Sequence, residues 1–112
     1  MTFSIERDKK EEFLLKEFKV KDGRITARRT SVKNALGMHA RPASKIAQMV
    51  DSARSEVWLC ANSTKVDASS VIDILTLGAV KGTLVVIEIE NQEDMMILDQ
   101  IFDFFEAGFG EL

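Results

Sequence analysis

The chain has 112 residues, of which 46% are hydrophobic and 29% charged, a composition typical of a single soluble globular domain. Its 15 basic and 18 acidic residues give a net charge of −3, which argues against a general nucleic-acid-binding protein. With one histidine and one cysteine, the chain can form neither the common zinc sites nor an internal disulfide, and we expect no metal or other cofactor.

The first residues, which are rich in charge, lack the apolar core of a secretory signal, and no apolar run is long enough to span a membrane. Together with the lone Cys60, this indicates a cytoplasmic protein without membrane insertion. Residues 1–24 favour a partly ordered extension. Their pattern also fits a short amphipathic helix, or a strand that turns at Asp22-Gly23.

Residues 25–33 contain several β-branched side chains and predict a strand, and turn-forming residues follow at 34–37. From Arg41 onward the apolar residues recur at helical spacing, which predicts a helix of about three turns. Lys45 lies on the outer side of this helix. We expect its inner side to bury Ala43, Ile46, Ala47, Val50 and Ala53.

Residues 56–61 and 64–68 predict a hairpin, residues 69–78 a short helix, and residues 83–90 the clearest strand. In the short helix the positions spaced for burial are Val71, Ile74 and Leu75. A final helix follows Asn91, stops at Gly108 and is expected to bury Leu98, Ile101, Phe102 and Phe105. The order β-α-β-β-α-β-α predicts an α/β fold of the α+β kind, a two-layer sandwich with an antiparallel sheet.

The only histidine, His39, stands three residues before the only proline, Pro42. Proline suits the first turn of a helix, so His39 lies just before the helix, beside N–H groups that have no intrahelical acceptor. These groups favour anions, and the Arg41 guanidinium suits phosphate oxygens. Gly37 permits a sharp bend and keeps bulk away from the ring. The pattern indicates a phosphoryl acceptor, although a surface or capping histidine also fits it.

The segment "LGMHARPAS" resembles the active-site segment of the histidine-containing phosphocarrier protein (HPr) family of the bacterial phosphoenolpyruvate-dependent phosphotransferase system. Ser70 lies 31 residues after His39, the separation of the phosphorylatable histidine and the regulatory serine in that family. The segment "SSVIDILTLGAVKG" resembles the helix of that serine. The resemblance implies an open-faced sandwich, with three helices on one face of a four-stranded sheet. It covers residues 25–112, and residues 1–24 form an extension outside the usual domain.

The resemblance implies that His39 accepts a phosphoryl group from enzyme I and passes it to enzyme IIA-type domains, while Arg41 holds the phosphoryl oxygens. Such a protein is a phosphoryl carrier rather than a conventional enzyme, and we expect a monomer. Ser70 would be the target of an HPr kinase/phosphorylase. The resemblance also implies a partner-binding surface formed by Lys45, Val71, Ile72 and Leu75.

Two acidic residues depart from the family pattern. Asp73 lies one helical turn from Ser70 and disfavours a phosphate there, and Asp51 lies on the outer side of the first helix, where some relatives carry a lysine. Two alternatives remain at this point. One is a regulatory interaction module that acts mainly through Ser70, and the other is an unrelated α/β sandwich that binds a small metabolite.

Overall fold

The computed structural model describes residues 20–21 and 24–112. The first two strands, β1 (Val20–Lys21) and β2 (Arg24–Ile25), form an antiparallel pair in which Lys21 lies opposite Arg24. The turn predicted at Asp22-Gly23 lies outside the described residues. The other expectations for the extension fall on residues 1–19, which lie outside the described residues.

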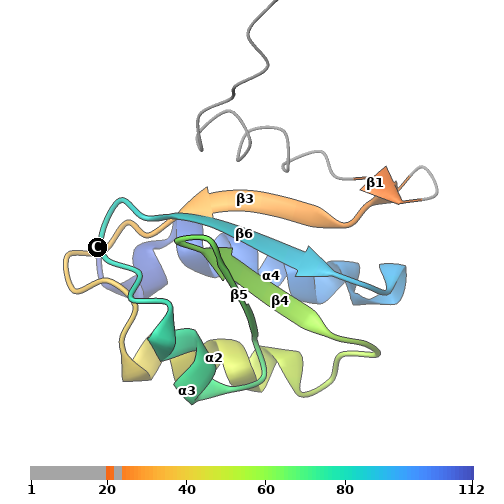
Figure 1. Cartoon of the computed structure of the whole chain (residues 1–112), viewed down its shortest axis with the longest axis horizontal. Coiled ribbons are helices and arrows are strands. Elements are labelled where there is room, and N and C mark those ends of the chain that lie inside the picture. The colour runs from red at the N-terminus through yellow and green to blue at the C-terminus, as the bar shows by residue number, and fades with distance from the viewer. Residues whose placement is uncertain (1–19, 22–23) are drawn as a thin grey trace, which may run out of the picture.

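The core of the protein is a four-stranded antiparallel sheet in the order β3-β6-β4-β5, with helices covering one face (Figure 1). This arrangement confirms the predicted α+β sandwich and the element order from the first long strand onward. The strands are β3 (Ala27–Ser31), β4 (Val57–Ala61), β5 (Thr64–Asp67) and β6 (Leu84–Ile89). The helices are α2 (Ala40–Val50), α3 (Val71–Thr76) and α4 (Met95–Glu106).

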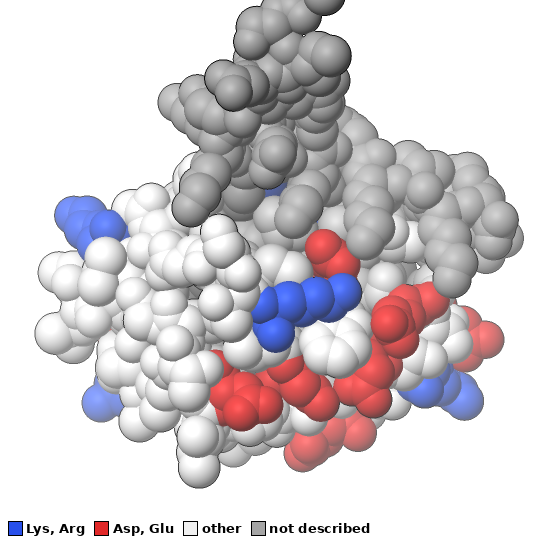
Figure 2. Space-filling model, viewed as in Figure 1, with Lys and Arg blue, Asp and Glu red and all other residues white. Residues whose placement is uncertain are grey.

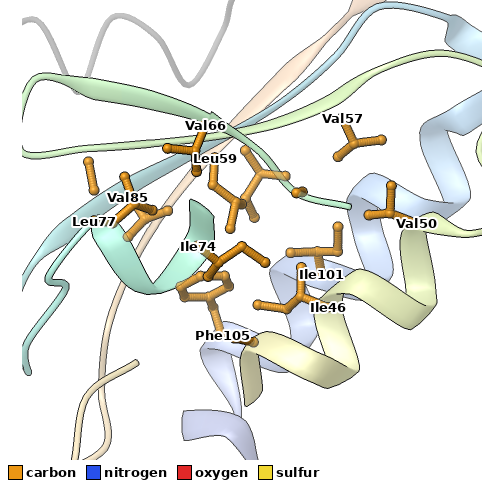
Figure 3. Close-up of a cluster of buried hydrophobic side chains, with 14 of the residues drawn as sticks. Ile46, Val50, Val57, Leu59, Val66, Ile74, Leu77, Val85, Ile101 and Phe105 are labelled. Carbon is orange, nitrogen blue, oxygen red and sulfur yellow. The ribbon is translucent and has the colours of Figure 1, made fainter. Parts of the chain in front are cut away.

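The hydrophobic core lies between the sheet and the helices. Along β6, Val85, Ile87 and Ile89 are buried, and Ile87 pairs with Leu59 of β4. Because side chains alternate across a strand, these residues point to the same face of the sheet. Figure 3 shows the core where side chains of the sheet meet side chains from all three helices. The helical side of this core includes Ile46, Val50, Ile74, Leu98, Ile101 and Phe105.

The buried positions predicted for α2 are confirmed, except that Ala53 lies beyond the helix and is half-buried. In α3 only Ile74 is fully buried, Val71 is half-buried, and the expectation for Leu75 is wrong because it is 39% exposed. A helix of 6 residues makes fewer than two turns, so it offers little inward-facing surface. The exposure of Leu75 therefore follows from the shortness of the helix.

The final helix is preceded by a separate 3-10 turn, η1 (Gln92–Asp94), which the sequence pattern did not predict. Asn91 caps this turn rather than the final helix itself, since its Oδ1 accepts a hydrogen bond from the Glu93 N–H at 2.8 Å. Phe102 is half-buried rather than buried, with the Arg28 guanidinium lying 3.7 Å from the centre of its ring. Arg28 also pairs with Asp99 of α4 at 2.9 Å, which holds the edge strand β3 to the helix.

The face of the sheet opposite the helices carries charged and polar side chains. Lys65 of β5 lies 3.4 Å from Glu88 of β6 and 4.9 Å from the centre of the Trp58 ring. Figure 2 shows acidic side chains gathered around a basic one on the visible face. The proximity of Asp67 raises the pKa of Glu56 through charge repulsion and a shared hydrogen bond. Repulsion between these carboxylates therefore weakens at acidic pH.

A buried carboxylate joins the loop after α2 to the start of α4. Asp94 is 1% exposed and accepts hydrogen bonds from the backbone N–H groups of Arg54 at 2.7 Å and Ser55 at 3.0 Å. Hydrogen bonds to a charged acceptor are stronger than those between neutral groups. The carboxylate thus fixes a loop that lies between two packed elements.

We predict that Asp94→Ala lowers the free energy of unfolding by about 3 kcal/mol, because two backbone N–H groups lose their buried, charged acceptor. Asp94→Asn, which keeps one acceptor oxygen, is expected to cost about half as much. Urea denaturation followed by circular dichroism measures both. The control is Glu93→Ala, which removes only the exposed ion pair between Glu93 and Arg54 and should change stability by less than about 0.5 kcal/mol. An Asp94→Ala variant as stable as this control would contradict the assignment.

Candidate functional site

His39 stands directly before α2, as the position of Pro42 predicts. Its backbone is extended, with φ −139° and ψ −175°, and its carbonyl oxygen accepts the Ala43 N–H at 3.1 Å. Its side chain is 31% exposed. The helix begins at Ala40, so the N–H groups of Ala40 and Arg41 lie in its first turn, where no intrahelical acceptor is available. The ring therefore lies beside donors that suit an anion.

The loop between β3 and α2 is held against the segment that follows α3. The Met38 N–H donates to the Ala79 carbonyl at 2.8 Å, and the Gly37 N–H donates to the Asn34 carbonyl at 3.2 Å. Gly37 has φ +72°, and a Cβ atom there would lie 2.8 Å from the Ala79 oxygen and 3.0 Å from the Val80 Cα. The bend expected at Gly37 is confirmed. The space that its missing side chain leaves is taken by the backbone of residues 79–80.

A carboxylate that the sequence pattern did not single out contacts the histidine. Glu111 Oε2 lies 2.7 Å from His39 Nε2, and Oε1 accepts a hydrogen bond from Asn34 Nδ2 at 2.8 Å. Asn34, which is fully buried, also donates to the Gly37 carbonyl at 2.9 Å. Figure 1 shows the C-terminal end of the chain beside the loop between β3 and α2. The only signal for this contact in the sequence is that an acidic residue, Glu111, follows Gly108 at the end of the last helix.

The hydrogen bond from Asn34 lowers the pKa of Glu111; burial opposes the shift, and His39 and Arg41 add to it. Glu111 therefore remains ionised well below neutral pH. An ionised carboxylate only accepts hydrogen bonds, so the hydrogen in the contact with His39 belongs to Nε2. The other ring nitrogen, Nδ1, has no hydrogen-bond partner within residues 24–112. The geometry thus leaves Nδ1 unengaged by any of these residues.

Comparison with known proteins identifies the family of this chain. The sequence model of the family described as "PTS HPr component phosphorylation site" matches residues 26–107. The chain belongs to the HPr family. It is 40% identical over 81 residues to the phosphocarrier protein HPr of Chlamydia pneumoniae, covering 72% of this chain and 75% of that protein. It is 39% identical over 85 residues to the phosphocarrier protein NPr of Proteus mirabilis, covering 75% and 94%.

Solved structures agree with the HPr fold. HPr-C-His from Thermoanaerobacter tengcongensis superposes with a TM-score of 0.71 at 30% identity, over 77% of this chain and 97% of that one. An HPr dimer from the same organism superposes with a TM-score of 0.60 at 32% identity, over 73% and 94%. The family match places the chain among the phosphocarriers of the phosphotransferase system and excludes an unrelated sandwich.

In this HPr-type domain, the other predicted site residues lie on α2 and at the start of α3. Arg41 and Lys45 are exposed on α2, and the Lys45 ammonium lies 5.8 Å from the centre of the Phe104 ring. Ser70 precedes α3 and caps it, since its Oγ accepts the Asp73 N–H at 3.2 Å. No hydrogen bond within residues 24–112 joins Ser70 to His39.

Several apolar side chains of this HPr-type domain are exposed. On α3, Ile72 is 75% and Leu75 39% exposed, while Val71 is half-buried. In the loops that meet beside the histidine, Leu36 is 75% and Val80 66% exposed, and the sequence pattern did not single out either of them. Apolar patches of this kind on a small soluble protein are typical of a surface that binds partners.

Two features are absent from the described part of the chain. Within it, no group of three histidine, cysteine, aspartate or glutamate side chains is placed to hold a metal ion. Nor does any of its helices have the length and apolar character needed to cross a membrane.

We predict that Gly37→Ala destabilises the domain by about 2–3 kcal/mol, since it combines a left-handed backbone with a collision against the backbone of residues 79–80. Gly78→Ala is the matched control. Gly78 has φ +60°, but a Cβ atom there would meet nothing within 4 Å, so only the backbone cost of about 1 kcal/mol applies. Thermal unfolding compares the two variants. Equal losses of stability in the two variants would show that the collision with residues 79–80 adds nothing to the cost of Gly37→Ala.

Proposed function

We propose that His39 accepts a phosphoryl group from enzyme I of the phosphotransferase system and passes it to enzyme IIA-type domains. The observation that carries this proposal is the state of the histidine ring. Its Nε2 is engaged by Glu111 at 2.7 Å, its Nδ1 is free within the described residues, and its side chain is 31% exposed. A nucleophile that must meet two protein partners in turn has to be accessible and correctly oriented.

The surroundings of the ring suit the group that is transferred. Phosphoryl transfer depends mainly on positioning and on stabilising charge on the phosphoryl oxygens. The N–H groups of Ala40 and Arg41 at the start of α2, and the exposed Arg41 guanidinium, provide donors and positive charge for those oxygens. In our proposal Arg41 holds the phosphoryl group while His39 forms the bond to phosphorus.

The proposed partner-binding surface consists of Lys45, Val71, Ile72 and Leu75. Ile72 and Leu75 present exposed apolar area, and Lys45 adds positive charge on the neighbouring helix. An apolar patch bordered by positive charge suits a partner with an apolar centre and an acidic rim. Such a surface permits successive, short-lived complexes with enzyme I and with enzyme IIA-type domains.

We further propose that residues 25–112 form the phosphocarrier domain and that residues 1–24 are an extension to it. The family match over residues 26–107 supports this division. A cytoplasmic, monomeric carrier is the simplest form of the proposed relay. Among the solved relatives, one HPr from Thermoanaerobacter tengcongensis is described as a dimer.

The relay is tested with radiolabelled phosphoenolpyruvate and enzyme I. We expect the wild-type chain to take up label that is lost in acid, as phosphohistidine is, and His39→Ala to take up none. Circular dichroism of His39→Ala should match that of the wild type, because the ring is partly exposed and lies outside the hydrophobic core. Undiminished labelling of a folded His39→Ala variant would refute the assignment.

A second role, regulation through Ser70, is supported by a separate observation. The Ser70 side chain lies at the start of α3, beside the exposed Ile72, and its Oγ accepts only one weak hydrogen bond within the described residues. A phosphate on Ser70 would add charge to the proposed partner-binding surface and change which partners it admits. The exposed Asp73 carboxylate, one turn away, opposes this modification by charge repulsion.

We expect an HPr kinase/phosphorylase with ATP to label the wild-type chain and Ser69→Ala, but not Ser70→Ala. Ser69 is the matched control because it is the neighbouring exposed serine and its hydroxyl instead donates to Asp67 at 2.7 Å. Mass spectrometry locates the phosphate. Label retained by Ser70→Ala would exclude Ser70 as the target.

A further inference from the structure

The segment after α4 folds back toward the histidine; we call residues 107–112 the hook. Gly108, Phe109 and Gly110 have φ values of +59°, +59° and +76° in succession. The Gly110 N–H donates to the Ala107 carbonyl and the Glu111 N–H to the Gly108 carbonyl, each at 3.0 Å. These bends reverse the chain at the end of the helix and bring Glu111 to the loop that carries His39.

Phe109 anchors the hook in the core. It is 4% exposed, and its ring lies 5.0 Å from the Phe104 ring and 4.9 Å from the Phe105 ring, measured between centroids. A phenylalanine with positive φ is strained by about 1–2 kcal/mol, so this conformation persists because packing compensates for it. The anchor restricts where the Glu111 side chain can go.

The Glu111 carboxylate is held at both of its oxygens. Oε1 accepts from the buried Asn34, which itself closes the loop by donating to the Gly37 carbonyl, and Oε2 accepts from His39. The Arg41 guanidinium makes no ion pair within residues 24–112, although its charge is near enough to affect Glu111. The carboxylate is therefore directed at the ring, and Arg41 stays available for another anion.

We propose that Glu111 is a positioning residue that fixes the His39 ring with hydrogen on Nε2, so that Nδ1 faces the phosphoryl donor. This inference rests on the proposed function of His39 and names a further residue that serves it. A carboxylate that accepts from one nitrogen of a histidine sets both the tautomer and the orientation of the ring. Asn34 and the hook in turn set the position of the carboxylate.

The transfer step needs no proton movement in this arrangement. The Nδ1 lone pair forms the bond to phosphorus while the bond between phosphorus and the phosphorylated protein donor breaks, and its electron pair returns to the donor. The ring then carries a positive charge, because Nε2 keeps its hydrogen. Glu111 balances that charge at 2.7 Å, and the reverse electron movement delivers the phosphoryl group to the acceptor.

The test compares Glu111→Ala, Glu111→Gln and Glu111→Asp. Glu106→Ala is the matched control, because Glu106 is a nearby acid that contacts Thr30 and Lys33 rather than the histidine. Nitrogen-15 NMR of the unphosphorylated proteins reports the tautomer of His39. Steady-state labelling with enzyme I and phosphoenolpyruvate gives kcat and KM for each carrier. Thermal unfolding separates positioning from any loss of stability.

We expect wild type and Glu106→Ala to carry hydrogen on Nε2, and Glu111→Ala to show both tautomers with kcat lowered roughly 10-fold at unchanged KM. Glu111→Asp should recover part of kcat, and Glu111→Gln, which retains an acceptor oxygen, should keep the tautomer but not the full rate. A wild-type tautomer and kcat in Glu111→Ala would overturn the proposal. The tautomer measurement uses no phosphoryl donor. It therefore tests the role of Glu111 separately from the relay, which the labelling of His39→Ala tests.

Discussion

The antiparallel pairing of β6 with both β3 and β4 determines where the functional residues lie. Because β3 and β6 run in opposite directions, the last residue of β3 and the first residue of β6 lie side by side at the same end of the sheet, with Ser31 opposite Leu84. The loop that carries His39 leaves β3 there, and residues 77–83 arrive there from α3. The inward side chains of β6 hold the helices that complete the site. The position of the site therefore depends on the order of the strands as well as on the residues that form it.

Most of the fold follows from local patterns in the sequence. The period of the apolar residues in α2 and the alternation along β6 are strong because each element has one buried face. Pro42 and Gly37 fixed the start of α2 and the bend before it, since each of these residues restricts the backbone in a particular way. The pattern was less informative for α3. The spacing of Leu75 suits burial, but the helix has only 6 residues and leaves this side chain 39% exposed.

The position of His39 and Arg41 at the start of α2 was predictable, whereas the side chains that we propose to orient the ring were not. Asn34 and Glu111 are 77 residues apart and meet only because the hook reverses the chain after α4. Nothing in the spacing of "AGFGEL" reveals that Phe109 adopts a positive φ or that it enters the core. Contacts between distant segments depend on packing, so single-sequence patterns identify the reacting group more readily than the groups that position it.

The hydrogen bond from the Met38 N–H to the Ala79 carbonyl has a mechanical consequence. Ala79 lies three residues after the end of α3. Between them, the Leu77 carbonyl accepts a hydrogen bond from Asn62 Nδ2 at 2.9 Å. Ser70 caps α3 and Met38 adjoins His39, so α3 and residues 77–79 connect the two phosphorylation sites proposed for this carrier. A shift of α3 would reach the loop that carries His39 directly, through the hydrogen bond between Met38 and Ala79.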